Sequence, residues 1–491
     1  MTSVRRAVVL SLVERYLLLV LALATNVALA RLLTPEQVGV FSVSLAVIGV
    51  AQAFRDFGIG SYLIQARDLG EAQIRTAFGI SLLLGATFFA ASLVAAPWAA
   101  GYYREPRMLG TLQISSMNFL LLPFCTVSLS LLRREMQFRR LLYVAVVAAA
   151  TGSLASISLA LAGFGENSLA VGAVLTNLVT GLGAWLARPG RSLLRPGFSA
   201  WRSVLKFGGQ SSIAGFVTSV SMDANDLVVG KLLGFHPVAM LSRAQGLMNL
   251  FHRDLMGAIR NVALPAFASA HRDGQSLEVP FAHSVALVTV FAWPFYGIVS
   301  VYALEILHLL YGPQWYEAKE LVPVFCMAGV FAAVNALTPN LLVAMGRIDL
   351  LTKLELSLQP VRLVLVVAAA LHYRTVFACS MAFLISAALA LPVFWWAKRQ
   401  CVDDNLPAIV RDLSRTLAVT AATLALPLIH ATWLGWGRDV PAPLWQWILV
   451  AGAGVGCGAV AVRQCSHPLA TEPVYVRISA MVGRVGSWRS Q

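Results

Sequence analysis

Charged residues are scarce in this chain. Only 12% of its 491 residues are Asp, Glu, Lys or Arg, whereas 58% are hydrophobic. Soluble domains carry roughly 25% charged residues, and a soluble core cannot hide this much apolar surface. The composition therefore excludes an ordinary soluble protein and predicts an integral membrane protein.

Motifs for chemistry are also missing. The six cysteines form no CxxC pair, so we expect no metal site, and no GxxxxGK[ST] sequence is present to bind nucleotide phosphates. The longest internal polar stretches, 188–206 and 398–413, fall short of the roughly 40 residues that a small domain needs. We therefore expect no cofactor and no soluble catalytic module, which favours a transporter over an enzyme.

Long apolar runs are abundant instead. A helix of about 20 apolar residues crosses a bilayer core of roughly 30 Å, and such runs follow one another along the whole chain. We expect an all-α protein with about 14 transmembrane helices. Their approximate ranges are 16–33, 37–54, 76–99, 111–132, 141–163, 168–187, 208–230, 238–251, 282–310, 321–345, 354–372, 375–397, 414–433 and 444–462.

The first run has a second interpretation, as a signal peptide. Arg5 and Arg6 precede it, and it ends in the small-residue pattern Ala28-Leu29-Ala30. Orientation follows from the Lys and Arg residues, most of which lie in the loops on one side when the N-terminus is cytoplasmic. We therefore expect both termini in the cytoplasm. Contact with anionic lipids then accounts for the net charge of +14 without nucleic acid as a partner.

A short motif occurs twice. RLLTPEQVGVFS at 31–42 and KLLGFHPVAMLS at 231–242 align at an offset of 200, each between the first and second helices of a set of six. Two such sets indicate parallel repeats around a central pathway. We predict two six-helix lobes related by a pseudo-two-fold axis, at 1–187 and 207–397. The basic linker 188–206 joins them, two additional helices follow at 398–463, and a basic tail ends the chain at 464–491.

Ionisable residues inside these helices point to the pathway. Each costs about 2.5 to 3.5 kcal/mol at a helix centre and persists mainly where it faces a cavity or a partner. The candidates are Glu14, Arg15, Asp223, Asp226, Lys231, Arg243 and Arg362, with Glu355 on the face of Arg362. Some of them could instead lie at the membrane interface or pair across helices. Arg243 and Asp226 fit that alternative least well, and a half-buried cation such as Arg243 suits a phosphate.

Two further groups allow alternative interpretations. The basic segment RREMQFRR at 133–140, together with the cations of 188–206, is either an inner-leaflet anchor or a first docking site for a lipid-linked phosphate. The aromatic residues Tyr102, Tyr103, Trp315 and Tyr316 near predicted outer loops either belong to an interfacial belt or stack on sugars.

Five stretches together resemble a known family. They are ALARLLTPEQVGVFS (28–42), FRDFGIGSYLIQARDL (54–69), LLRREMQFRRL (131–141), ANDLVVGKLLGFHPVAMLSRAQGL (224–247) and YGPQWYEAKELVPVF (311–325). Over nearly the whole chain they are similar to the polysaccharide transporter family of the multidrug/oligosaccharidyl-lipid/polysaccharide exporter superfamily, above all to its Wzx-type flippases.

The resemblance implies a flippase for undecaprenyl-pyrophosphate-linked oligosaccharides in the bacterial inner membrane. It would supply exopolysaccharide or lipopolysaccharide synthesis, with a polysaccharide polymerase and export machinery as candidate partners. The family pattern matches Asp226 and Arg243. For such a function we expect the pyrophosphate to be bound by Arg243, Arg15, Arg362 and Lys231, and we expect the cavity or coupling acids to be Asp226, Asp223 and Glu14. A drug exporter of the same superfamily and a membrane polymerase or ligase are the alternatives. The sugar, the pathway, the coupling ion and the oligomeric state leave no local signature.

Overall fold

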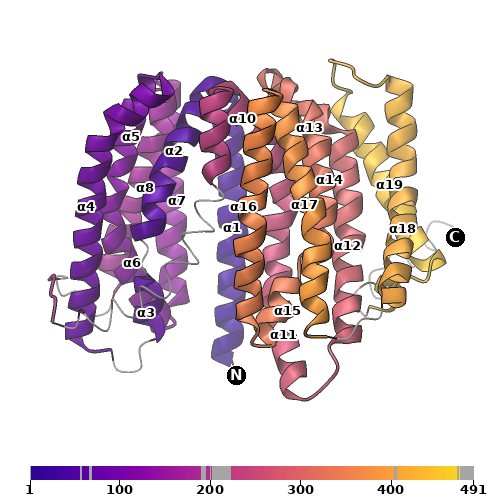
Figure 1. Ribbon diagram of the computed structural model, residues 1–491, viewed down its shortest axis with the longest axis horizontal. Helices are drawn as coiled ribbons and strands as arrows, with labels where there is room; N and C mark the ends of the chain where they lie inside the picture. The colour runs from indigo at the N-terminus through magenta and orange to yellow at the C-terminus, as the bar shows by residue number, and fades with distance from the viewer. Residues whose placement is uncertain are drawn as a thin grey trace, which may run out of the picture. The chain divides into compact units, whose positions relative to one another are not determined.

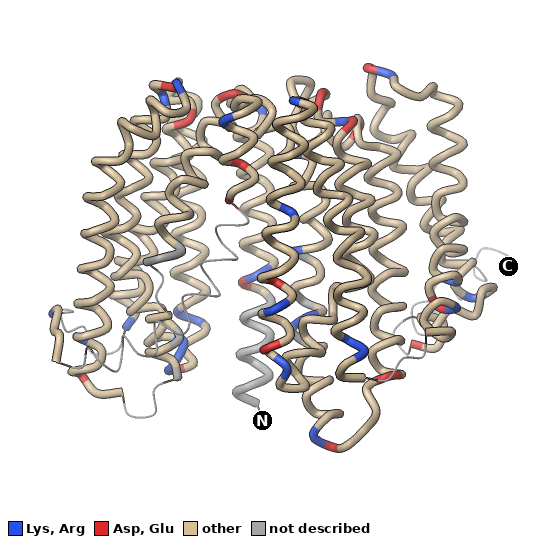
Figure 2. The backbone as a smooth tube through the Cα atoms, viewed as in Figure 1, with Lys and Arg blue, Asp and Glu red and all other residues tan. Residues whose placement is uncertain are grey.

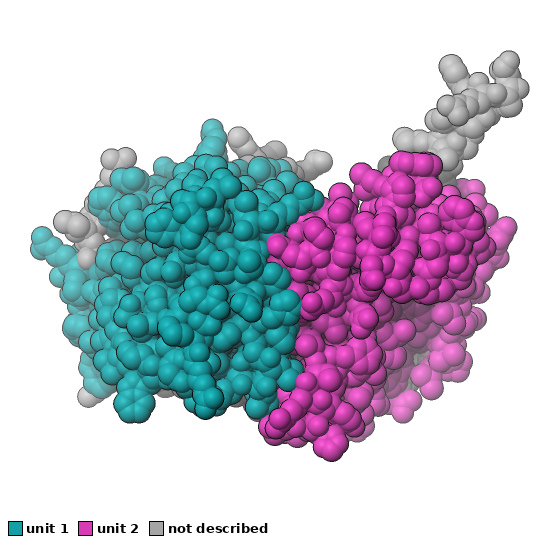
Figure 3. All heavy atoms as spheres, turned by 90° about the horizontal axis from the view of Figure 1, so that it is seen from above, with its two compact units in different colours: residues 1–239 teal, residues 240–491 magenta. Residues whose placement is uncertain are grey.

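The computed structural model describes residues 2–55, 58–65, 69–188, 195–199, 201, 223–402, 406–472 and 475. These residues form helices, turns and loops, and no strand occurs among them, which confirms the all-α prediction. The chain divides into two compact units, Met1–Ala239 and Met240–Gln491 (Figure 3).

Unit 1 is a bundle of antiparallel helices (Figure 1). Its labelled helices are α1 (Thr2–Leu32), α2 (Pro35–Arg55), α3 (Ile59–Gln65), α4 (Glu71–Tyr103), α5 (Arg107–Ser116), α6 (Asn118–Arg134), α7 (Phe138–Leu161) and α8 (Glu166–Ala187). Residues 223–232 add a helical segment, and α10 (Phe235–Asn249) begins at the end of the unit. Helices suit such apolar sequences because they satisfy every backbone hydrogen bond within one segment.

Small residues allow a close helix pair in unit 1. A methyl group on Gly152 of α7 would overlap Thr176 of α8, and one on Gly172 of α8 would overlap Ser156 of α7. The two glycines therefore let the backbones of α7 and α8 approach each other, the arrangement by which helices associate where lipid offers no hydrophobic drive.

The repeated motif marks two equivalent turns. The chain leaves α1 at Leu32 and starts α2 at Pro35, and one repeat later it leaves the helical segment 223–232 and starts α10 at Phe235. The two turns also touch, since a methyl group on Gly39 would overlap the Phe235 carbonyl. Further along α2, Val43 meets Gly230 and Gly49 meets Asp223, so the helical segment 223–232 runs antiparallel to α2. The predicted positions of both turns are confirmed.

Unit 2 contains the rest of α10 and the C-terminal helices (Figure 1). They are the π-helix η1 (Leu250–Leu255), α11 (Met256–Arg272), α12 (Glu278–Val301), α13 (Ala303–Leu310), the 3-10 helix η2 (Pro313–Glu320), α14 (Val322–Asn335), α15 (Thr338–Ala344), α16 (Ile348–His372), α17 (Val376–Arg399), α18 (Leu406–Leu434), α19 (Leu444–Gln464) and the 3-10 helix η3 (Pro468–Thr471). Helix α12 packs against both α14 and α18, and α19 packs on α18.

The eighth predicted helix is longer than its apolar run. We expected it to end at residue 251, but α10, η1 and α11 follow one another without a break from Phe235 to Arg272. The cations that follow residue 251 ended the hydropathic signal, whereas the helical backbone continues through the π-helix. Arg260, which falls between the predicted ranges 238–251 and 282–310, therefore lies in a helix.

The described residues contain 11 helices long and apolar enough to cross a membrane. They correspond to all predicted spans except the second, seventh and eighth. The second is present as α2, and the eighth as the long helix just described. Most of the seventh, 208–230, lies outside the described residues, as do most of the predicted linker 188–206 and of the tail 464–491. The predicted domain limits stay predictions.

The two additional helices, α18 and α19, are fastened to unit 2 at the loop that joins them. Arg438 in this loop forms an ion pair with Glu305 of α13, whose side chain is buried. The Ala442 N–H donates to the same carboxylate at 3.2 Å, and Lys319 of η2 contacts Asp439 at 2.5 Å. The buried carboxylate of Glu305, which has two partners in this loop, fixes the loop in place, because breaking the ion pair would leave a buried charge without a partner.

The opposite end of the hairpin is held by His467. Its ring is fully buried, Nδ1 accepts from Leu469 N–H at 3.1 Å, and Nε2 lies 3.0 Å from the Thr416 hydroxyl of α18. Because Nδ1 accepts, the proton sits on Nε2 and the ring is neutral. Burial lowers the pKa of His467 to about 4, so this contact holds at neutral pH.

Candidate functional site

Most charged residues lie near helix ends, and a few lie within helices (Figure 2). In unit 1, Lys231 is engaged at such an end. Its ammonium lies 3.9 Å from the centre of the Tyr102 ring and donates to the Tyr102 carbonyl. The Tyr103 hydroxyl donates to Leu227 O at 3.1 Å. Lys231 therefore joins the end of α4 to the helical segment 223–232, the interfacial arrangement that was the alternative to a binding role.

The two predicted acids of unit 1 lie together. Asp223 and Asp226 are one turn apart on the helical segment 223–232 and repel each other electrostatically. Asp223 packs directly against Gly49 of α2, where no side chain would fit. An acid pair of this kind can bind a proton or a cation, which lowers the repulsion between the two carboxylates.

The other two predicted residues of unit 1 lie on α1. Glu14 and Arg15 are both partly buried, and Glu14 interacts electrostatically with Arg133 at the end of α6. This interaction places a predicted cavity acid within electrostatic range of the basic segment of residues 133–140. Glu14 thus has a cationic neighbour inside unit 1.

The basic segment divides into structural and exposed arginines. Arg134 donates to the carbonyls of Leu63 and Ile64 at 3.1 and 3.2 Å, and Arg140 donates to Ala187 O at 2.7 Å. These bonds satisfy carbonyls at the C-termini of α3 and α8. Arg133 and Arg139 are exposed, so these two remain available to an anionic surface.

In unit 2, Arg243 is enclosed by aromatic rings. It is 8% exposed, and its guanidinium carbon lies 4.9 Å from the centre of the Tyr311 ring and 4.6 Å from that of Trp315. Trp315 is fully buried, so it does not stand in an exposed interfacial belt. The structure thus shows Arg243 linking α10 to the turn around η2 by cation–π contacts.

Arg362 belongs to a second polar group of unit 2. Its guanidinium carbon lies 5.7 Å from the centre of the Phe383 ring, and it interacts electrostatically with Glu355. Gln359 donates to Glu355 at 2.8 Å. Glu355 and Arg362, seven residues apart on α16, therefore lie within electrostatic range of each other.

A third polar group of unit 2 was missed from the sequence. His252 of η1, Arg260 of α11 and Tyr296 of α12 each bury a polar atom that has no hydrogen-bond partner among the described residues. The signal that could have found them is the spacing of His252 and Arg260, eight residues apart and so on one face of a continuous helix. Hydropathy does not reveal this spacing, because the apolar run ends at residue 251.

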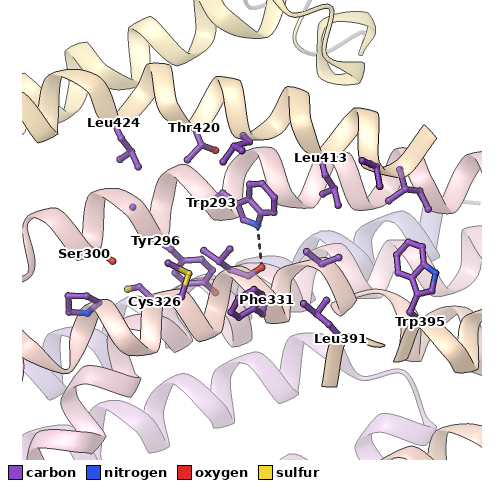
Figure 4. A pocket seen from close by; sticks show the side chains of 18 of the residues that line it. Trp293, Tyr296, Ser300, Cys326, Phe331, Leu391, Trp395, Leu413, Thr420 and Leu424 are labelled. Carbon is purple, nitrogen blue, oxygen red and sulfur yellow. Dashed lines mark hydrogen bonds between the residues drawn. The ribbon is translucent and has the colours of Figure 1, made fainter. Parts of the chain in front are cut away.

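A large apolar pocket lies beside this group (Figure 4). Its volume is about 890 Å³, and its lining comes from α12, α14, α17 and α18. Trp293, Tyr296, Trp395 and Leu424 are among the lining side chains, and the Trp293 indole donates to Val330 O at 3.2 Å. The walls are nearly all hydrocarbon, which suits an apolar chain.

The buried cations and the apolar pocket of unit 2 are suited to binding a ligand. Buried cations in apolar surroundings favour anions, and no group of three or more His, Cys, Asp or Glu residues that could hold a metal occurs in the part of the chain that the structure describes. These features fit a transporter of amphiphilic or anionic compounds.

Comparison with known proteins agrees with this assessment. The lipopolysaccharide biosynthesis protein WzxC of Escherichia coli (strain K12) is 23% identical over 349 residues, covering 69% of this chain and 70% of WzxC. The succinoglycan biosynthesis transport protein ExoT of Rhizobium meliloti (strain 1021) is 26% identical over 328 residues, 64% of either chain.

Solved structures share the fold. The lipid II flippase MurJ in an inward closed conformation matches with a TM-score of 0.74 at 11% identity, over 93% of this chain and 99% of MurJ. An inward-facing multidrug resistance MATE transporter matches with a TM-score of 0.64 at 16% identity, over 78% of this chain and 94% of that one. These proteins are transporters, as we expected for this chain. A family model described as polysaccharide biosynthesis protein matches residues 28–320, and the chain therefore belongs to this family, within the polysaccharide transporters of the exporter superfamily that the sequence resembles.

Proposed function

We propose that this protein is a flippase for undecaprenyl-pyrophosphate-linked oligosaccharide repeat units. It moves them from the cytoplasmic to the periplasmic leaflet of a bacterial inner membrane, where they enter exopolysaccharide or lipopolysaccharide synthesis. Membership of the polysaccharide biosynthesis family over residues 28–320 carries the proposal. Both termini are cytoplasmic in this proposal, and a polysaccharide polymerase and export machinery are the expected partners.

The site geometry supports such a substrate. A sugar headgroup cannot cross hydrocarbon without losing its hydrogen bonds to water, so a flippase has to offer polar groups inside the membrane. Unit 2 has Arg260 and Arg362 within its helices, together with an apolar pocket of about 890 Å³. The cations suit the pyrophosphate, and the pocket suits the hydrocarbon chain of the same molecule.

Alternating access supplies the mechanism. The substrate enters from the cytoplasmic leaflet, its phosphates contact the cations, and the two lobes then expose it to the other side. Asp223 and Asp226 are the acids that would couple this change to an ion gradient, since binding of a proton or cation relieves their mutual repulsion.

A deletion strain tests the proposal. We expect loss of surface polysaccharide and accumulation of intact lipid-linked repeat units on the cytoplasmic face of the inner membrane, with the wild-type gene restoring both. The sidedness of the repeat unit is measured in oriented membrane vesicles with a sugar-modifying enzyme that cannot cross the membrane.

Two other outcomes would contradict the proposal. Unpolymerised repeat units on the periplasmic face would place this protein after translocation. Normal polysaccharide with increased sensitivity to cationic dyes would favour the drug exporter, since the MATE transporter that shares the fold is a multidrug resistance protein.

A further inference from the structure

Three side chains of unit 2 converge with unused hydrogen-bonding capacity. They are His252 of η1, Arg260 of α11 and Tyr296 of α12. The atoms concerned are His252 Nδ1, Arg260 Nε and the Tyr296 hydroxyl, which are buried and have no hydrogen-bond partner among the described residues. Tyr296 is only 1% exposed. An unsatisfied buried polar group costs about 1 to 3 kcal/mol. These three belong to side chains that interact with one another electrostatically, so together they call for a physical reason.

The π-helix explains how Arg260 is oriented. The Met256 N–H bonds to Phe251 O, five residues back, and not to His252 O, its partner in a regular α-helix. His252 O instead accepts a hydrogen bond from Arg260 Nη2 at 3.3 Å. Asn340 donates to the Arg260 carbonyl at 3.2 Å and holds the backbone there. One corner of the guanidinium is therefore fixed, while its Nε–H is left without an acceptor among the described residues.

Tyr296 is oriented just as firmly. Its ring lies against Gly329 of α14, where an added methyl group would meet the ring, and it makes an edge contact with Phe251 at 5.7 Å between centroids. The phenol and the Arg260 guanidinium interact electrostatically. A donor is thus held near the cation by packing.

The chemistry of these groups selects an anion. Arg260 Nε–H and the Tyr296 hydroxyl both donate, and the neutral His252 ring donates from Nδ1 in one of its tautomers. None of the ion pairs found in the described residues gives Arg260 an acidic partner. A metal cation would be repelled, whereas a phosphate oxyanion would accept from all three donors and balance the charge.

We propose that Arg260, His252 and Tyr296 form an oxyanion site that binds a phosphate group of the lipid-linked substrate. This inference rests on the proposed flippase function and names the residues that bind the pyrophosphate. It replaces Arg243 in that role, because both Tyr311 and Trp315 cover the Arg243 guanidinium. The Nε atoms of Arg243 and Arg260 both have no hydrogen-bond partner among the described residues. The two arginines differ in that the Arg243 guanidinium lies against two aromatic rings, whereas Arg260 lies near two further donors, His252 and Tyr296.

Binding of a short analogue to the purified full-length protein tests the site. The probes are farnesyl diphosphate, inorganic pyrophosphate and farnesol, measured by isothermal titration calorimetry with the protein in nanodiscs of zwitterionic lipid. Arg260→Gln should weaken farnesyl diphosphate binding about tenfold or more, since charge-assisted hydrogen bonds are lost. Tyr296→Phe keeps the ring over Gly329 and should weaken binding about threefold to tenfold. The matched control Arg253→Gln removes an exposed arginine of η1 and should bind like the wild type.

Each result has a defined meaning. Equal binding by Arg260→Gln and Arg253→Gln, or no diphosphate binding by the wild type, overturns the site. If Arg260→Gln does not fold, Tyr296→Phe decides, and unchanged binding by this variant overturns the site as well. Stronger binding of inorganic pyrophosphate than of farnesyl diphosphate overturns the lipid-linked assignment. If diphosphate binding depends on Arg260 but the deletion strain still carries repeat units on the periplasmic face, the site stands and the flippase function is wrong. If the deletion strain accumulates repeat units on the cytoplasmic face but binding does not depend on Arg260, only the site is wrong.

Discussion

Arg243 and Arg260 lie on the same long helix but in different surroundings. Arg243 places its positive charge against the faces of Tyr311 and Trp315, and Arg260 donates one N–H to the His252 carbonyl. A cation–π contact is worth about 2 kcal/mol when desolvated, so Arg243 contributes to the folded state by itself. No aromatic ring is found over the Arg260 guanidinium among the described residues, so Arg260 lacks this stabilising contact. In the sequence, Arg243 and Arg260 look alike, but their surroundings give them different roles.

Removal of the Arg243 charge should therefore destabilise the protein. We expect Arg243→Met and Trp315→Leu each to lower the midpoint of thermal unfolding in detergent, and the double variant to lose less than the sum, because both remove the same contact. Their coupling should be about 1 to 2 kcal/mol. Arg253→Met, at an exposed position, serves as the control. Additive losses, or a selective loss of farnesyl diphosphate binding in Arg243→Met, would restore the binding role that the sequence predicted.

Residue roles were only partly predictable. Scarcity of charge led to Arg243, Arg362 and Asp226, and the seven-residue spacing placed Arg362 on the helix face of Glu355, with which it interacts electrostatically. Arg260 falls outside the predicted helices because it follows the end of an apolar run. The sequence does not mark Tyr296 as a binding residue, because an aromatic residue is ordinary in an apolar helix. The π-helix orients Arg260, and α12 brings Tyr296 close to it, so the two residues come together only in the folded structure.

Glycines decide how closely the helices of each unit approach. In α19, Gly454 and Gly458 face α18, where methyl groups would overlap the Thr423 carbonyl and hydroxyl respectively. Gly452 and Gly456 of the same helix have nothing within 4 Å. The GAGVGCG stretch of residues 452–458 therefore has one packed face and one open face, although its glycines alternate without distinction in the sequence.

The two faces should respond differently to the same substitution. We expect Gly454→Ala to force α18 and α19 apart and cost about 1 to 3 kcal/mol, because the obstructing atom belongs to the backbone and cannot rotate away. Gly456→Ala should be neutral or slightly stabilising, since alanine has the higher helix propensity. Thermal unfolding of both variants in the same detergent measures the difference. Equal shifts would contradict this account of the packing.

On the scale of the whole molecule, the charge of the loops predicts how the helices cross the membrane. In unit 1 the α6–α7 turn at Met136 carries the arginines of residues 133–140, and the α7–α8 turn at Phe164 lies at the other end of α7. Both side chains are exposed. Because positively charged short loops remain in the cytoplasm, we expect the Met136 turn inside and the Phe164 turn outside.

Cysteine labelling checks this orientation. In a background with all six native cysteines replaced by serine, Phe164→Cys should react with a membrane-impermeant maleimide in intact spheroplasts. Met136→Cys should react only after the membrane is permeabilised. The reverse pattern would invert the topology and, with it, the proposed direction of transport.

The sequence by itself determined the class and the plan of this protein. Hydrophobic runs determine which segments enter a bilayer, because the cost of burying charge there is local and additive, and the repeated motif marked both helix turns at Pro35 and Phe235. Tertiary structure decided which groups surround each ionisable residue. The partners of Arg243, Arg260 and Asp223 come from helices distant in the chain. Contacts of this kind depend on packing in three dimensions, which no local pattern of residues records.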